Sequence, residues 1–201
     1  MNTFNEKGYQ PVKEIIGEEL IHIATQYALL DEVTNFSPES KDAQVEGSHS
    51  RYGDLLMESI LMALHPKMEY VTGLKLIPTY SYYRVYRPGN ELKPHTDRPA
   101  CEISTTVSFG RNYQDANDYK WGMFIEDKEI VLEPGDAIVY KGCDVKHWRE
   151  KFSAPQFSYH VQGFFHYVDA NGPHKDQALD KRNFIGEPRK VSSKDYITYL
   201  K

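Results

Sequence analysis

The chain of 201 residues has little of what marks membrane, secreted or cysteine-rich proteins. Its only cysteines, Cys101 and Cys143, are too few for a disulfide framework or a cysteine-rich zinc site. The longest aliphatic run, residues 60–64, is far shorter than the ~20 apolar residues of a membrane-spanning helix. No basic segment followed by an apolar core marks a signal peptide. We therefore expect a soluble protein of the reducing cytoplasm, with no membrane partner.

Basic charge and phosphate-binding motifs are also scarce. Lys plus Arg number 24 and Asp plus Glu number 29, which gives a formal net charge of −5. This balance argues against a nucleic-acid partner, because a phosphate backbone attracts a basic surface. Gly89 and Gly110 stand alone, and strands do not alternate with helices. A nucleotide-binding α/β fold is therefore not expected.

Helical periodicity is confined to the first third of the chain. Apolar residues recur at three- and four-residue steps over residues 12–30, and Pro11 suits the first turn of such a helix. A second apolar stripe follows Ser50, a candidate N-cap, and Pro66 marks its expected end. Residues 1–72 are therefore predicted to form a helical N-terminal part.

Short β segments separated by turns dominate the rest of the chain. The predicted strands span residues 80–86, 103–109, 137–140 and 157–168, with a hairpin over residues 121–133. Helices followed by many strands predict an α+β or mainly β fold, such as a β-barrel supported by helices. We expect one domain over residues 1–201, with a β core over 73–169 and a mostly polar tail over 170–201.

The residues best suited to metal chemistry are His95 and Asp97. Side chains two apart on an extended chain share a face, so this imidazole and this carboxylate can turn toward one ion. A distant histidine completes a facial triad, which holds Fe(II) and leaves open positions for O2 and a chelating substrate. His147 suits this role best because it follows a turn, a strand and a loop. A second pair, His174 and Asp176, lies beyond the last strand and is expected to be solvated.

These segments together resemble the Fe(II)/2-oxoglutarate-dependent oxygenases, and within them the prolyl-4-hydroxylase-like branch. The resemblance covers residues 74–169 and is carried by Tyr86-Arg87-Pro88-Gly89, Pro94-His95-Thr96-Asp97, Glu133 to Tyr140, and His147. It implies a double-stranded β-helix, or jelly roll, with N-terminal helices packed outside the barrel and iron at its mouth. His95, Asp97 and His147 match the family's metal-ligand pattern one by one.

The resemblance also implies a site for 2-oxoglutarate, although the sequence departs from the family there. The family binds the distal carboxylate with Arg or Lys on the strand after the second iron histidine, and residues 157–168 contain neither. His160 on that strand and Arg84 on an earlier one are the expected substitutes, whereas Arg149 fits poorly by position. Tyr86 occupies the place of a tyrosine that faces the co-substrate, and its phenol can donate a hydrogen bond.

Further residues are expected around this site. Alternate residues over 80–86 share one strand face, as do those over 160–166, and both faces are expected to line the pocket. Arg98 is a candidate to orient the carboxylate of its neighbour Asp97.

By resemblance, we expect an Fe(II)- and 2-oxoglutarate-dependent dioxygenase that uses O2 to hydroxylate a C–H bond and releases succinate and CO2. Its substrate is a peptide, a protein or a small molecule. One alternative is a cupin-type metal enzyme that uses no keto-acid, which the missing basic anchor favours. Another is a non-catalytic jelly-roll binding module, in which substitution of His95 or His147 leaves ligand affinity unchanged. Neither the substrate nor the oligomeric state follows from the sequence.

Overall fold

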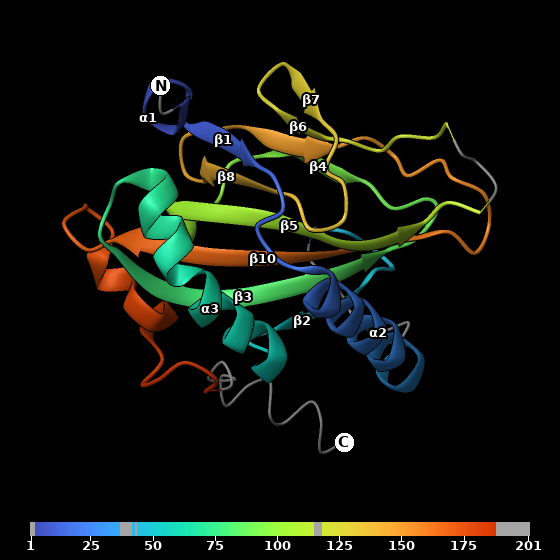
Figure 1. The fold of residues 1–201 in the computed structure, drawn as a ribbon, viewed down its shortest axis with the longest axis horizontal. Coiled ribbons are helices and arrows are strands. Elements are labelled where there is room, and N and C mark those ends of the chain that lie inside the picture. Colours follow the sequence, from blue (N-terminus) through green and yellow to red (C-terminus); the bar gives the residue numbers. More distant parts are fainter. Residues whose placement is uncertain (1–2, 37–41, 43, 115–117, 188–201) are drawn as a thin grey trace.

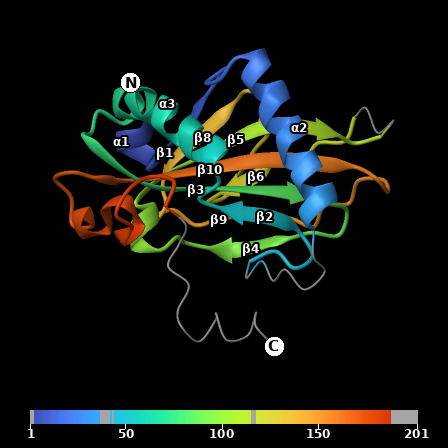
Figure 2. The ribbon, with the colours of Figure 1, turned by 90° about the horizontal axis from the view of Figure 1, so that it is seen from below.

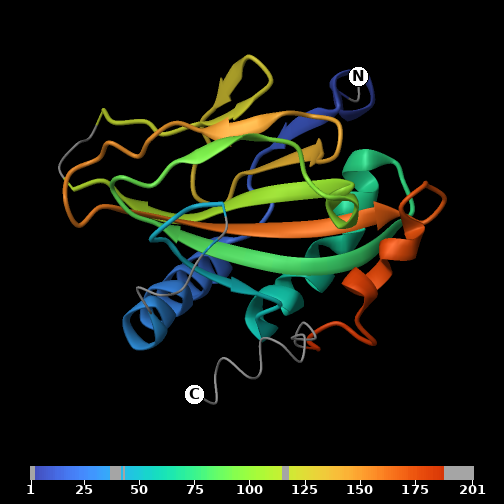
Figure 3. The same cartoon turned by 180° about the vertical axis from the view of Figure 1, so that it is seen from behind.

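Two antiparallel sheets facing each other form the centre of the structure, a computed structural model that describes residues 3–36, 42, 44–114 and 118–187. The larger sheet contains β1 (Tyr9–Val12), β2 (His49–Tyr52), β3 (Leu76–Tyr86), β5 (Ile103–Asn112), β8 (Ala137–Lys141) and β10 (Tyr159–Asp169). The smaller sheet contains β4 (Leu92–His95), β6 (Met123–Ile125), β7 (Lys128–Ile130) and β9 (His147–Arg149). The strand orders are β1-β8-β5-β10-β3-β2 and β4-β9-β6-β7 (Figure 1). In Figure 3, the yellow hairpin of β6 and β7 projects at the edge of the smaller sheet. This arrangement is the expected double-stranded β-helix.

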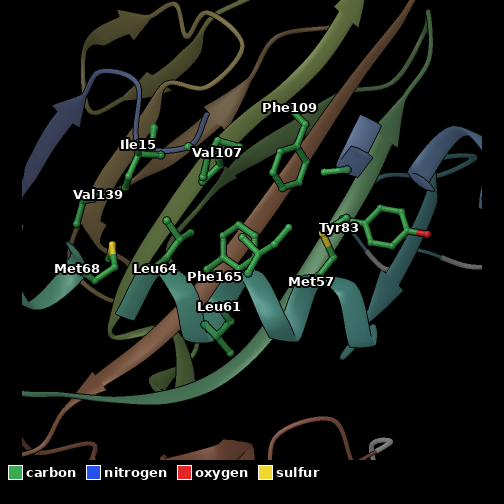
Figure 4. Packing of buried hydrophobic residues seen from close by; sticks show 14 of the residues in the cluster. Ile15, Met57, Leu61, Leu64, Met68, Tyr83, Val107, Phe109, Val139 and Phe165 are labelled. Carbon is green, nitrogen blue, oxygen red and sulfur yellow. The ribbon is translucent and has the colours of Figure 1, made fainter. Parts of the chain in front are cut away.

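Helices cover the outer face of the larger sheet. Figure 2 shows α2 (Glu18–Asn35) and α3 (Leu55–Thr72) lying across it, as predicted for helices packed outside the barrel. The core between these layers includes Leu61 and Leu64 of α3 and Phe165 of β10 (Figure 4). The inner face of the sheet is thereby left for the site. No helix of the described residues is long and apolar enough to cross a bilayer.

The second helix differs from its prediction at both ends. It begins after Asp54 rather than Ser50, because the Asp54 carboxylate accepts hydrogen bonds from backbone N–H groups two and three residues later, at 3.0 and 3.3 Å. It continues through Pro66 and ends at Gly73, whose φ of 73° suits a left-handed C-cap. Burial of Met68 after the proline offsets the one backbone hydrogen bond that proline cannot donate.

The first predicted helix begins too early. Residues 9–12, which include Pro11, form β1 and pair with β8 at the edge of the larger sheet. An edge strand tolerates proline because one of its sides needs no ladder hydrogen bond. The short strands β1, β2, β4 and β9 were not predicted, since three or four residues carry too little alternation to be recognised.

The buried face of α2 is also different from the predicted apolar stripe. Ile23 is 53% exposed, whereas Ala24 and Ala28 are fully buried against the sheet. The approach is close enough that a Cβ added to Gly110 of β5 would lie 2.4 Å from Thr25 Oγ1 of α2. Small side chains permit this contact, so helix packing rather than hydrophobicity decides which face is buried.

The segment after β10 is not a free polar tail over its described part. It contains the 3-10 helix η2 (Lys175–Lys181), which contacts β3. Arg182 forms a buried ion pair with Glu58 of α3 at 2.9 Å and donates to the backbone carbonyl of Thr79 at 2.8 Å. These contacts fasten the chain beyond the barrel back onto its outer layer. The remaining short helices are α1 (Thr3–Lys7) and η1 (Pro99–Cys101).

Candidate active site

A cavity of about 490 Å³ is lined by residues of both sheets. Its wall includes Tyr80, Tyr82 and Arg84 of β3, Phe164 and His166 of β10, Tyr140 of β8, Met123 of β6, and His147 and Arg149 of β9. The strand faces predicted to line the pocket therefore do so in part. Tyr86, His160 and Gln162 share these faces but do not line the cavity.

The structure brings His95, Asp97 and His147 together at this cavity. His95 ends β4 and pairs with His147 of β9, while Asp97 lies in the loop after β4. The Nε2 atoms of His95 and His147 lie 3.7 and 3.6 Å from Asp97 Oδ1. One ligand atom from each residue lies within 4.8 Å of the other two, which is close enough to bind one ion.

Backbone carbonyls set the orientation of both imidazoles. His95 Nδ1 lies 2.8 Å from the carbonyl oxygen of Lys93, and His147 Nδ1 lies 2.9 Å from that of Val145. A carbonyl can only accept, so each Nδ1 is the donor, and the Nε2 of a neutral ring keeps its lone pair. Such outer hydrogen bonds are usual for metal-binding histidines. The two rings are therefore ready to coordinate through Nε2.

The electrostatics of the group favour the protonation states that a cation needs. Burial, and then the proximity of His147, lowers the pKa of His95 and keeps that ring neutral at pH 7. Burial opposes ionisation of Asp97, but the proximity of His147 outweighs it, and the pKa of Asp97 is lowered. An anionic carboxylate beside a neutral imidazole is the form that binds a metal ion.

Two residues that sequence reasoning missed hold Asp97 in place. Asp97 donates its backbone N–H to the Gly142 carbonyl at 2.8 Å, and a Cβ at Gly142 would lie 2.6 Å from Asp97 Oδ2. Ser104 Oγ donates to the same Oδ2 at 3.2 Å. Arg98, expected to orient this carboxylate, instead forms a bidentate ion pair with Asp180 at 2.6 and 2.9 Å.

Arg149 is a buried cation in the cavity wall. It follows His147 by two residues on β9, so both side chains share a face. Nη1 donates to the Trp121 carbonyl at 2.9 Å, and the Trp121 ring centre lies 4.5 Å from the guanidinium carbon. Nη2 has no hydrogen-bond partner among the described residues, none of which supplies a carboxylate to this guanidinium. Burial lowers the pKa of Arg149, as it does for a charge without a counter-ion.

Arg84 is equally buried but already has a partner. Its Nε and Nη2 donate to the two carboxylate oxygens of Asp42, at 2.8 and 3.0 Å, and Nη1 donates to Tyr86 Oη at 2.9 Å. The Tyr86 ring centre lies 5.3 Å from the guanidinium carbon of Arg84 and 5.9 Å from that of Arg149. Tyr86 is therefore placed between two cations, and the described residues supply a carboxylate to only one of them.

His160, expected as a charged anchor, does not line the cavity, and both of its ring nitrogens have hydroxyl partners. Its Nδ1 lies 2.8 Å from Tyr113 Oη and its Nε2 lies 3.3 Å from Ser108 Oγ. Burial, followed by the nearby charge of Arg149, lowers the pKa of His160 well below its usual value, so the ring is neutral. Gln162, two residues later, is fully buried, and neither atom of its amide has a partner among the described residues. Sequence reasoning could have found Gln162, because a polar amide is unusual within a strand that is otherwise expected to be buried.

Comparison with known proteins links this fold to iron and 2-oxoglutarate enzymes. No protein-family model and no curated protein sequence matches the chain. Among solved structures, a prolyl-4-hydroxylase from Pseudomonas putida is similar, with 16% identity, a TM-score of 0.62, and coverage of 81% of this chain and 94% of that one.

Two further structures cover more of the chain. The non-heme α-ketoglutarate-dependent epimerase SnoN of nogalamycin biosynthesis has 13% identity and a TM-score of 0.68, covering 94% of this chain and 90% of its own. A Trichoplax adhaerens prolyl hydroxylase, solved with a peptide fragment, has 15% identity, a TM-score of 0.63 and coverage of 90% of each chain. At these identities the likeness shows the fold, which is the one that the sequence resemblance implied.

Proposed function

We propose that this protein is an Fe(II)- and 2-oxoglutarate-dependent dioxygenase. The observation that carries the proposal is the convergence of His95, Asp97 and His147 on one point of a cavity, inside a fold shared with such enzymes. Two imidazole nitrogens and one carboxylate oxygen are the donor set of the facial triad for non-heme Fe(II). The residues present therefore fit this metal, and these three would hold it.

The cavity also offers a counter-ion for a dicarboxylate. A buried guanidinium without an acidic partner costs several kcal/mol, which an anionic ligand offsets. We therefore assign the distal carboxylate of 2-oxoglutarate to Arg149, in place of His160 and of Arg84, whose charge Asp42 already neutralises. Tyr86 and Gln162 do not line the cavity, so contact of Tyr86 with the co-substrate stays a prediction from the resemblance.

When bound, iron and 2-oxoglutarate supply the oxidising power that converts a substrate C–H bond to an alcohol with O2, releasing succinate and CO2. The protein residues position the metal ligands and shield the cavity from water. His95 and His147 are held by backbone carbonyls, and the aromatic wall of Tyr80, Tyr82 and Phe164 limits water and leaves an apolar surface for a substrate. The substrate is a peptide, a protein or a small molecule.

The buried cation also weighs against the alternatives. A cupin-type metal enzyme without a keto-acid, or a binding module without a metal, leaves the Arg149 guanidinium without an anion from the part of the chain that the structure describes. We further propose that the protein acts as one domain in the reducing cytoplasm, where its two free cysteines persist as thiols.

The test is anaerobic addition of Fe(II) and 2-oxoglutarate, followed by the visible charge-transfer band of the chelate and, after admission of O2, by succinate release. The wild type is expected to give both signals, and His147→Ala neither. His22→Ala is the matched control, because this histidine is exposed on α2 far from the triad in sequence. A wild type that gives no band and no succinate overturns the proposal.

A further inference from the structure

A second group of metal-ligating side chains lies beside the triad. Asp97, Cys101 and His166 each offer a ligand atom, and these atoms lie within 4.8 Å of one another. All three residues line the cavity, and the thiol and the second imidazole are buried. Carboxylate, thiolate and imidazole are the three donor types that bind zinc in proteins.

The fold holds His166 firmly in this group. His166 lies on β10 opposite Tyr80 of β3 and Ser104 of β5. Its ring centre is 4.5 Å from that of Tyr80, and its Nδ1 lies 2.8 Å from Ser104 Oγ. Among the described residues its ring makes no hydrogen bond through Nε2, which leaves that atom to the cavity. A ring fixed on one side and open on the other suits a metal ligand.

Cys101 reaches the same point from η1. Its side chain is almost fully buried, and Sγ lies 3.0 Å from Tyr80 Oη, the same tyrosine that packs on His166. The other cysteine, Cys143, lies outside the group and is more exposed. Cys101 is therefore the candidate ligand, and substitution of Cys143 provides a control.

Asp97 has an oxygen atom for each group. Oδ1 lies 3.7 and 3.6 Å from the Nε2 atoms of His95 and His147. Oδ2 lies 3.2 Å from Ser104 Oγ, which also lies 2.8 Å from His166 Nδ1 and 3.0 Å from the Cys101 carbonyl oxygen. One carboxylate thus borders both sets of donors, and Ser104 orients two members of the second set.

We propose that Asp97, Cys101 and His166 form a second metal site, which takes a thiophilic divalent cation such as Zn(II). Three protein ligands with one open position match tetrahedral zinc coordination. Zinc also binds such donors more tightly than Fe(II) does, and a thiolate widens the difference. Because Asp97 serves both sites, zinc at the second site competes with iron for this carboxylate. The cavity would then lose its iron-dependent activity when zinc is abundant.

Anaerobic titration of the whole metal-free chain with Co(II) tests the assignment. A cobalt–thiolate bond gives intense near-ultraviolet charge transfer, which imidazole and carboxylate ligands do not give. The band is expected in the wild type, in Cys143→Ser and in His147→Ala, and it is expected to be absent from Cys101→Ser. No thiolate band in a wild type that binds Co(II), or a band lost in Cys143→Ser and kept in Cys101→Ser, overturns the second site.

Zinc affinity, measured by competition with a chromophoric chelator, gives an independent readout. The comparison is made in His147→Ala, where the triad is incomplete. There, His166→Gln is expected to weaken zinc binding by roughly tenfold or more while the protein keeps its far-ultraviolet circular dichroism, and it replaces Cys101→Ser if that variant does not fold. Equal zinc affinity in His147→Ala with and without His166→Gln overturns the assignment. Neither experiment uses 2-oxoglutarate, so failure of the second site is distinct from failure of the proposed dioxygenase.

Discussion

Replacement of Arg149 by methionine is expected to weaken co-substrate binding strongly at little cost in stability. The guanidinium is buried, donates to the Trp121 carbonyl and has no carboxylate partner among the described residues. Methionine loses that hydrogen bond, worth about 1.5–3 kcal/mol, and the contact with the indole, worth about 0.5–2 kcal/mol. It also removes an uncompensated buried charge, whose penalty is several kcal/mol. The free energy of unfolding without ligand is therefore expected to change by less than about 2 kcal/mol.

Arg84→Met is the matched comparison, because Arg84 is equally buried in the same cavity wall. Both members of its ion pair with Asp42 have 2% of their side-chain surface exposed. Removal of the guanidinium strands a buried carboxylate, which costs about 3–5 kcal/mol. Two substitutions of the same type are thus expected to differ in stability, in a direction set by whether the arginine has an acidic partner. Urea denaturation of the metal-free proteins measures this difference.

The affinity for 2-oxoglutarate, in contrast to the stability, is expected to fall strongly in Arg149→Met. Loss of one partner of a buried, hydrogen-bonded charge pair costs about 2–5 kcal/mol of binding free energy. Since 1.4 kcal/mol is about tenfold in affinity, Arg149→Met should weaken 2-oxoglutarate binding by roughly 30-fold or more. Anaerobic calorimetry in the presence of Fe(II) measures the affinity. Wild-type affinity in Arg149→Met, or a loss of stability as large as that of Arg84→Met, would refute the assignment of Arg149 as the anchor.

Three further outcomes follow from the same structure. Gly142→Ala should weaken Fe(II) binding by roughly tenfold in calorimetry, because the new Cβ would lie 2.2 Å from the Cys101 carbonyl oxygen and 2.6 Å from Asp97 Oδ2, so that both must shift; unchanged affinity would contradict this account of the carboxylate's position. Burial opposes ionisation of Asp31, but its hydrogen bonds outweigh burial and lower the pKa of Asp31 to about 2. The ionised Asp31 carboxylate therefore stabilises the fold above pH 4, and this stabilisation is lost between pH 4 and 2. In urea denaturation, the free energy of unfolding of Asp31→Asn should be about 1–2 kcal/mol below that of the wild type at pH 7, and the difference should vanish near pH 2. A difference that does not change with pH would exclude ionisation as its source. Arg182→Met should destabilise the protein by about 3–5 kcal/mol in urea, because it strands the buried Glu58, and a loss below 1 kcal/mol would argue against that pair as the fastening of the C-terminal segment.

The grouping of His95 with Asp97 could be predicted from the sequence because that part of the pattern is local. His95 and Asp97 lie two residues apart at the end of a strand, and His147 follows a recognisable turn and strand. The carboxylate anchor was not predictable in the same way. Arg84 looked available because nothing in the sequence pairs it with Asp42, which lies 42 residues away in the chain. Only the contacts of the folded chain show which of two buried guanidinia has no carboxylate partner among the described residues.

The helical part shows the same limit. Apolar spacing over residues 12–30 predicted a helix, and α2 is present, but its start was set by the pairing of β1 with the edge of the larger sheet. Its buried face was set by the close approach of Ala24 and Ala28 to that sheet. Both features depend on partners that are distant in sequence, and a periodicity count contains no information about them.

The position of the cation on β9 rather than β10 also has a physical explanation. The two strands belong to opposite sheets, and the inner faces of both sheets border the same barrel interior. A carboxylate there needs a guanidinium that faces inward and has no other anion, and either sheet can supply it. The inner face of β10 carries the neutral His160 and the amide of Gln162, so a second cation on that strand is not required when Arg149 faces the cavity from β9. Under the proposed dioxygenase function, the departure from the pattern of the resembled family is therefore a relocation of charge within one cavity.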